Sequence, residues 1–230
     1  MRANFPAVTD FNAIPTGDMP GDKVQITDDH VAKAQAIFPP LWESLQPLLA
    51  DSPHHRAVVA VHGGSGVGKS ETGSLLAYGL NALGVGAYVL SGDNYPRRVP
   101  SANDAERLRV FRAGGLQGLV AAGSYDPTVR AALADLQASD RDADATFVAT
   151  HPWLTTYQKA GRKALAGYLG TPAEVDFAEI SRILAAFHDG AGSLMLKRMG
   201  RTPDALWYDE VDVTDTQVIV VEWTHGNNDY

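Results

Sequence analysis

A glycine-rich segment at residues 63–70, Gly-Gly-Ser-Gly-Val-Gly-Lys-Ser, restricts what this chain can fold into more than any other feature. It directly follows the β-branched run 57–61, which is typical of a buried parallel strand. Apolar residues with helical spacing come next and stop at Gly84. A second strand is predicted at 87–90, and this β-loop-α-β succession favours an α/β fold with a largely parallel sheet.

The segment matches the phosphate-binding pattern G-x-x-x-x-G-K-[ST] in full. Glycines let backbone N–H groups turn toward phosphate oxygens, and the following helix presents its positive N-terminus to the same anion. A chance match in a glycine-rich turn is the alternative, which the flanking strand and helix disfavour. The predicted cofactors are ATP and Mg²⁺, with Lys69 on the β- and γ-phosphates and the Ser70 hydroxyl on the metal. The predicted nucleotide-binding residues are Gly63, Gly64, Ser65, Gly66, Val67, Gly68, Lys69, Ser70 and Glu71.

The overall charge argues against a nucleic-acid partner. Lys and Arg total 19 and Asp and Glu total 27, so the net charge is −8 and an anionic ligand needs a local positive site. The absence of cysteine excludes thiol catalysis, Cys-ligated zinc and disulfides. No apolar run reaches the roughly 18 residues that span a bilayer, and the first ten residues do not resemble a signal peptide. We therefore expect a cytoplasmic protein without a membrane partner.

Two carboxylates follow predicted strands, at the edge where a parallel sheet binds its ligands. Asp93 comes shortly after the strand at 87–90, and Glu222 ends the apolar run 218–221. We predict that Asp93 accepts the proton of an acceptor hydroxyl, and that Glu222 holds Mg²⁺ or positions the attacking group. The alternatives are a turn cap for Asp93 and a solvent-facing strand end for Glu222.

A cluster of arginines near Asp93 is the candidate for the local positive site. Arg97 and Arg98 lie closest, and guanidinium groups suit phosphate or carboxylate recognition, although a scaffold role is an equal alternative. Arg107, Arg109 and Arg112 are as readily explained by the exposed face of a helix. The predicted acceptor-binding residues in this region are Asp93, Tyr95, Arg97 and Arg98, and His225 is added from the C-terminal segment.

The remaining elements are predicted from periodicity and turn residues. Residues 1–27 are expected to form an irregular arm, and two helices are expected within 30–50, separated by a break at Pro39-Pro40. Further helices are predicted at 104–122, 126–138, 152–169 and 173–188, an acidic exposed connector at 135–144, and strands at 147–150, 206–213 and 217–223.

Together these features resemble the P-loop small-molecule kinases, and most closely the phosphoribulokinase, uridine kinase and bacterial pantothenate kinase group. The similarity covers the 63–70 loop, Ser-Gly-Asp93-Asn-Tyr-Pro, the segment 177–196, Trp-Tyr-Asp at 207–209 and Val-Ile-Val-Val-Glu222. It implies a P-loop NTPase-type three-layer α/β/α fold with a helical insertion between the second strand and the Walker B-like strand. It also implies transfer of the ATP γ-phosphate to a hydroxyl of a small metabolite, with Asp93 as base, Glu222 as the Walker B-like acid, and Tyr208 and Asp209 at the acceptor.

The resemblance implies a kinase-like domain at 57–230, preceded by an N-terminal arm and helices at 1–56. Residues from about 113 to 170 have no counterpart and are expected to be the helical insertion. The family continues past the acidic strand with an arginine-bearing lid and an adenine-binding loop, whereas this sequence stops at Tyr230. Either the chain is a C-terminally incomplete fragment, or its sheet is completed differently.

Three other functions remain open. Adenylylsulfate kinase resembles the chain around Asp93, and HPr kinase/phosphorylase resembles it from Gly66 to Thr72. A nucleotide-binding regulatory ATPase is the alternative from another class. Dependence on an acceptor distinguishes them, because a kinase turns over ATP quickly only when its hydroxyl substrate is present. The expected partner is a small-molecule hydroxyl acceptor, with a homodimer as an open alternative.

Overall fold

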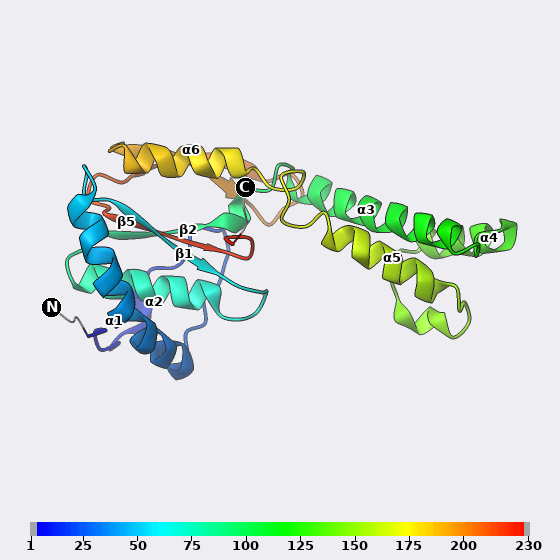
Figure 1. Cartoon of the computed structure of the whole chain (residues 1–230), viewed down its shortest axis with the longest axis horizontal. Helices are drawn as coiled ribbons and strands as arrows, with labels where there is room; N and C mark the ends of the chain where they lie inside the picture. Colours follow the sequence, from blue (N-terminus) through cyan, green and yellow to red (C-terminus); the bar gives the residue numbers. More distant parts are fainter. Residues whose placement is uncertain (1–3, 228–230) are drawn as a thin grey trace. The chain divides into compact units, whose positions relative to one another are not determined.

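The computed structural model describes residues 4–227, which divide into two compact units (Figure 1). The first unit contains the chain up to Pro100 and from Val175 onward. The second contains Ser101–Glu174 and is helical. The expected insertion, about residues 113–170, lies inside this second unit.

A parallel sheet of three strands forms the centre of the first unit. Strand β1 (Ala57–His62) leads through α2 (Lys69–Ala82) to β2 (Ala87–Ser91), and β5 (Val218–Trp223) lies between them in the order β1-β5-β2. The α/β class and the parallel pairing are therefore confirmed. The last apolar strand of the chain is also adjacent to the strand before the glycine-rich loop.

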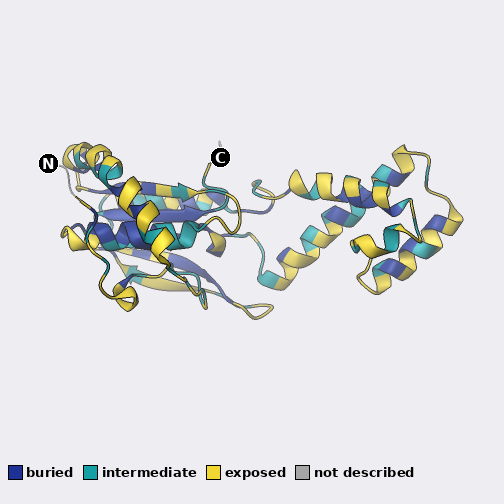
Figure 2. Ribbon diagram, turned by 90° about the horizontal axis from the view of Figure 1, so that it is seen from below, coloured by how far each residue is buried: buried dark blue, intermediate teal, exposed yellow. Residues whose placement is uncertain are grey.

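Both faces of this sheet are covered, as Figure 1 shows for helices α1, α2 and α6. Along β5, Val218 and Val220 belong to the hydrophobic cluster under α1 (Asp28–Asp51) and α2, whereas Ile219 and Val221 belong to the cluster under α6 (Phe177–His188). All six residues of β5 are buried, as expected for a central parallel strand. Figure 2 shows these strands buried between helices with exposed outer faces.

An antiparallel hairpin joins α6 on its side of the sheet. It consists of β3 (Ser193–Met199) and β4 (Leu206–Asp212), with Lys197 opposite Tyr208 and Arg198 opposite Trp207. The strand predicted at 206–213 is confirmed, but β3 was not predicted. Its sequence contains two adjacent charged residues, Lys197 and Arg198, that are buried in the structure, so it lacks the alternation that indicates a strand.

The predicted break at Pro39-Pro40 is wrong, because α1 runs continuously over 24 residues through both prolines. A proline deprives the carbonyl four residues earlier of its helical donor, here the carbonyls of Gln35 and Ala36, which lie on exposed positions of the helix. Phe38, Leu45 and Leu49, on both sides of the prolines' position, pack into one cluster, so tertiary packing outweighs the local signal.

Two further boundaries differ from prediction. The segment 147–150 is not a strand, since Asp144 caps a 3-10 helix at Ala145–Val148 by accepting from the Thr146 backbone N–H at 2.8 Å. Helix α6 begins at Phe177 rather than near 173, because Val175 forms a β-bridge with Pro96 and the Asp176 side chain caps the helix. The segment before α6 is thereby held against the end of β2.

The helical unit contains α3 (Pro100–Ala121), α4 (Pro127–Ala138) and α5 (Leu154–Ala166). Helices α3 and α5 pack closely, and a Cβ on Gly118 would lie only 2.3 Å from the Ala160 Cβ. The connector predicted to be exposed at 135–144 contains Asp142, which is 1% exposed and accepts hydrogen bonds from Tyr157 and Arg112. That prediction is wrong at this residue, because the arginine and tyrosine compensate the burial of its charge.

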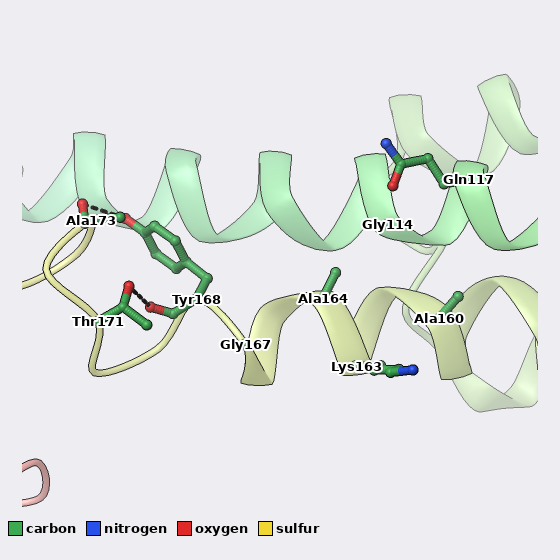
Figure 3. A pocket seen from close by; sticks show the side chains of 9 residues that line it. All are labelled: Gly114, Gln117, Ala160, Lys163, Ala164, Gly167, Tyr168, Thr171 and Ala173. Carbon is green, nitrogen blue, oxygen red and sulfur yellow. Dashed lines mark hydrogen bonds between the residues drawn. The ribbon is translucent and has the colours of Figure 1, made fainter. Parts of the chain in front are cut away.

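A shallow pocket of about 520 Å³ lies on this unit between α3 and α5, and its lining side chains are drawn in Figure 3. Two of its hydroxyl groups donate within the chain, Thr171 to the Tyr168 carbonyl at 2.7 Å and Tyr168 to the Ala173 carbonyl at 3.5 Å. The lining is otherwise dominated by glycine and alanine. We therefore place the candidate active site in the first unit.

Candidate active site

The glycine-rich loop lies at the carboxyl end of β1 and opens helix α2, as its pattern requires. Gly66 and Gly68 have φ values of 76° and 87°, which side chains with a Cβ rarely adopt. The loop residues from Gly64 to Val67 are exposed, and the Lys69 ammonium donates to the Gly64 carbonyl at 2.9 Å. The first N–H groups of α2 have no helical partners and point toward this loop, which suits an anion.

The Glu222 carboxylate receives a hydroxyl hydrogen bond on each oxygen. Ser70 at the start of α2 donates to Oε2 at 3.1 Å, and Ser91 at the end of β2 donates to Oε1 at 2.6 Å. Glu222 is 5% exposed, and this burial raises the pKa of its carboxyl above the ordinary range, with a further contribution from the charge of Asp93. Three separate chain segments thus converge on one acid group.

Asp93 lies on the short 3-10 helix η2 (Gly92–Asn94), directly after β2. Its backbone N–H donates to the Ser91 hydroxyl oxygen at 3.1 Å, so the same serine contacts both Glu222 and the Asp93 backbone. Asp93 itself is exposed, unlike the buried Glu222. The structure therefore brings Lys69, Ser70, Asp93 and Glu222 to one edge of the sheet.

The donor set at this edge fits Mg²⁺. Among residues 4–227 no group of three His, Asp or Glu side chains could hold a metal ion by itself. Magnesium usually keeps several waters and binds one or two protein ligands together with substrate phosphates. The Ser70 hydroxyl and the Glu222 carboxylate offer such a partial set, and a cation beside Glu222 would stabilise its charged form against burial.

A buried network from the N-terminal arm holds the end of β2. Asp18 Oδ1 accepts from the Ser91 backbone N–H at 2.7 Å and from the Asn94 side-chain amide at 3.0 Å. Its Oδ2 accepts from the Arg198 guanidinium at 2.7 Å and from the Tyr88 hydroxyl at 3.1 Å. The Asp18 and Arg198 side chains are only 6% and 8% exposed. The arm and the hairpin therefore position the residues around Asp93.

Sequence reasoning did not identify Asp18, Asn94 or Arg198. The arm showed no periodicity, and Arg198 stands in a strand that was not predicted, so neither residue had a signal that linked it to the site. Asn94 and Ser91 lie within the segment quoted around Asp93, and their polar side chains at a strand end were the available signal.

The predicted acceptor-binding residues have different environments. Tyr95 is fully buried and its hydroxyl has no hydrogen-bond partner among residues 4–227, so a ligand would contact it only after neighbouring side chains move. Arg97 is 42% exposed and pairs with Asp176 at 3.1 Å. Arg98 is half-buried beside it, and His225 packs edge-on against Trp223 at 5.8 Å between ring centroids.

On the hairpin, the Tyr208 hydroxyl donates to Glu179 at 2.7 Å, and Asp209 accepts from the Arg198 guanidinium at 3.1 Å. Glu179 also lies 3.9 Å from the ammonium of Lys197, which donates to the Pro96 carbonyl at 2.6 Å. Burial lowers the pKa of Lys197. This lysine ties the hairpin to the segment that follows Asp93.

The arginines on α3 have local partners. Arg107 pairs with Glu174 at 2.6 Å, and Arg109 pairs with Glu106 at 2.7 Å. Arg112 contacts Asp142 at 2.9 Å and Asp140 at 2.8 Å. Each therefore has a structural role within the helical unit, which agrees with the scaffold alternative.

Among residues 4–227, every helix is too short or too polar to cross a lipid bilayer.

One curated protein shows clear similarity to the chain. It comes from Mediterraneibacter gnavus, is named bifunctional alpha-galactosidase/sucrose kinase AgaSK, and is 34% identical over 190 residues. The match covers 82% of the present chain but only 15% of the relative's length. The relative's name gives two activities, and one of them is that of a sucrose kinase. No family model matches the chain, and no solved structure matches it.

Proposed function

We propose that the chain is an ATP-dependent kinase that transfers the γ-phosphate of ATP to a hydroxyl group of a small sugar. The observation that supports this most is the hydrogen bond between Ser70 and Glu222, which joins the phosphate-binding loop to an acidic strand end. The similarity to a protein whose name includes sucrose kinase supports a sugar as acceptor. Sucrose is therefore the first acceptor to test.

In the proposed site, the β- and γ-phosphates lie against the loop backbone and the N-terminus of α2. The Lys69 ammonium leaves the Gly64 carbonyl, which it contacts at 2.9 Å, and binds the same phosphates. Ser70 and Glu222 would hold Mg²⁺, which offsets the negative charge that develops during transfer. The exposed loop leaves these backbone donors accessible to a nucleotide.

The proposed transfer step is an in-line displacement. The Asp93 carboxylate takes the proton of the sugar hydroxyl while the oxygen of that hydroxyl forms a bond to the γ-phosphorus. The bond between that phosphorus and the bridging oxygen breaks, and ADP leaves with the electron pair. Asp93 suits this role because it is exposed at the edge of the sheet, whereas Glu222 is buried behind Ser70 and Ser91.

An acceptor panel tests this proposal. The chain is incubated with ATP, Mg²⁺ and each of sucrose, glucose, fructose, a nucleoside, pantothenate and glycerate, and ADP release is measured. We expect release to rise strongly with one of the sugars and to require Lys69, so that Lys69→Ala abolishes it. Equal ADP release with and without every acceptor would contradict the kinase and favour a regulatory ATPase.

A further inference from the structure

A second cavity lies next to the phosphate-binding loop, between α1, β1 and the start of α2. Its volume is about 420 Å³, within the range of small-ligand sites. It is lined by Lys33, Ile37, Leu41, Val59, Ala60, Val61, His62, Val67, Gly68, Lys69, Thr72 and Leu76. Four of these residues, Val67, Gly68, Lys69 and Thr72, belong to the loop or to the first turn of α2, so the cavity is continuous with the phosphate site.

Helix α1 directly contacts the loop on this side. A Cβ added to Gly68 would lie 3.0 Å from Nε2 of His30, so the imidazole in the first turn of α1 packs against the loop backbone. Lys33, Ile37 and Leu41 follow His30 at helical spacing and line the cavity from the same side of α1. The N-terminal helix is therefore a wall of this site.

Much of the cavity wall is apolar. Ile37 is 42% exposed and Val67 is 57% exposed, and both belong to the lining together with Leu41 and Leu76. Apolar side chains of this size left open to water beside a binding loop gain free energy when a ring covers them. The lining also contains Lys33 and Lys69, whose positive charges suit a ligand joined to phosphates.

The free edge of β1 adds hydrogen-bonding groups to the cavity. Within residues 4–227, β1 pairs with β5 and with no strand on its other side. The Ala57 N–H donates to Gln217 in the direction of β5, so by alternation the N–H and C=O of Ala60 point to the free edge. Ala60 lines the cavity, and such a donor–acceptor pair matches the edge of a purine base.

We propose that this cavity binds the purine base of the nucleotide, with Ile37 and Leu41 of α1 covering one side of the ring and Ala60 contacting its edge. This inference rests on the proposed function, because it assumes a nucleotide whose phosphates occupy the 63–70 loop. It assigns the base to residues before and within β1 rather than to a segment after β5. Inorganic tripolyphosphate should therefore bind without using the cavity.

Calorimetric titration of the full chain with two ligands tests this assignment. The ligands are a non-hydrolysable ATP analogue and tripolyphosphate, each with Mg²⁺. Ile37→Gln removes apolar contact without adding charge and should weaken the analogue about fivefold or more while leaving tripolyphosphate unchanged. Leu48→Gln is the matched control, because Leu48 is 59% exposed on the same helix and is not part of the lining, and it should change neither affinity.

The outcomes separate the inference from the proposed function. Lys69→Ala should weaken both ligands, since it contacts phosphate. If Lys69→Ala weakens the analogue but Ile37→Gln does not, or if Ile37→Gln weakens both ligands equally, the base site is overturned and the kinase proposal stands. If the unaltered chain binds neither ligand, the proposed function and the base site both fail.

Discussion

The Ser91 hydroxyl donates a 2.6 Å hydrogen bond to Oε1 of Glu222, and these two residues are paired in register at the ends of neighbouring parallel strands. The same hydroxyl accepts the Asp93 backbone N–H, so one serine contacts both residues to which we assign different tasks. Glu222 is buried and Asp93 is exposed. This difference favours a metal-holding role for the first and proton transfer for the second.

Replacing Ser91 should therefore affect the metal more than the nucleotide. In Ser91→Ala the Glu222 carboxylate loses one hydrogen-bond donor and its orientation, and groups that orient metal ligands typically contribute about 10-fold to 100-fold in affinity or activity. We expect the Mg²⁺ concentration for half-maximal transfer to rise by about tenfold. Ser44→Ala is the control, since Ser44 is exposed on α1 and its hydroxyl donates to the Pro40 carbonyl, away from the site. An unchanged Mg²⁺ dependence would argue against Glu222 as a ligand.

Asp93→Asn tests the base. The amide keeps the shape of the side chain but cannot take a proton, and general base catalysis contributes about 10²-fold to 10⁴-fold. We expect kcat to fall by about that factor while the affinity for the ATP analogue stays the same. Asp189→Asn serves as control, because Asp189 is exposed at the end of α6. Transfer at the original rate in Asp93→Asn would refute the base assignment.

The ion pair between Asp18 and Arg198 should stabilise the first unit and hold the site in place. Within residues 4–227, Asp18→Asn leaves the buried Arg198 guanidinium with the partly exposed Asp209 as its one remaining acidic partner. Breaking a buried pair in this way should lower the free energy of unfolding by about 3 kcal/mol, measured in urea. Replacing both residues, with Asp18→Asn and Arg198→Met, should restore part of the loss. Equal stability of Asp18→Asn and the unaltered chain would contradict this role.

The sequence predicted the fold best where short-range residue patterns determine the local structure. The glycine-rich loop, the strand before it and the helix after it have strong local signals, and β5 is apolar at four consecutive positions, so the parallel core could be predicted. The adjacency of Glu222 to Ser70 followed from general rules for parallel sheets. These parts depend on short-range patterns and on one topological rule.

The rest depends on contacts between distant segments. Asp18 reaches Arg198 across 180 positions of sequence, and no local pattern in either segment indicates that pair. Strand β3 could not be predicted because its two charged residues are buried. Lys197 is stabilised there by the Pro96 carbonyl and Arg198 by the Asp18 carboxylate, and neither partner is close in sequence. The prolines of α1 gave a strong local signal that tertiary packing outweighs.

The most direct test of the central claim is to follow ATP and sucrose together by ³¹P NMR in the presence of Mg²⁺. The account predicts that a phosphomonoester of the sugar forms in step with ADP, that ADP formation is slow without a sugar, and that Lys69→Ala forms neither product. Release of ADP and inorganic phosphate at one rate, whether or not any sugar of the panel is present, would contradict it.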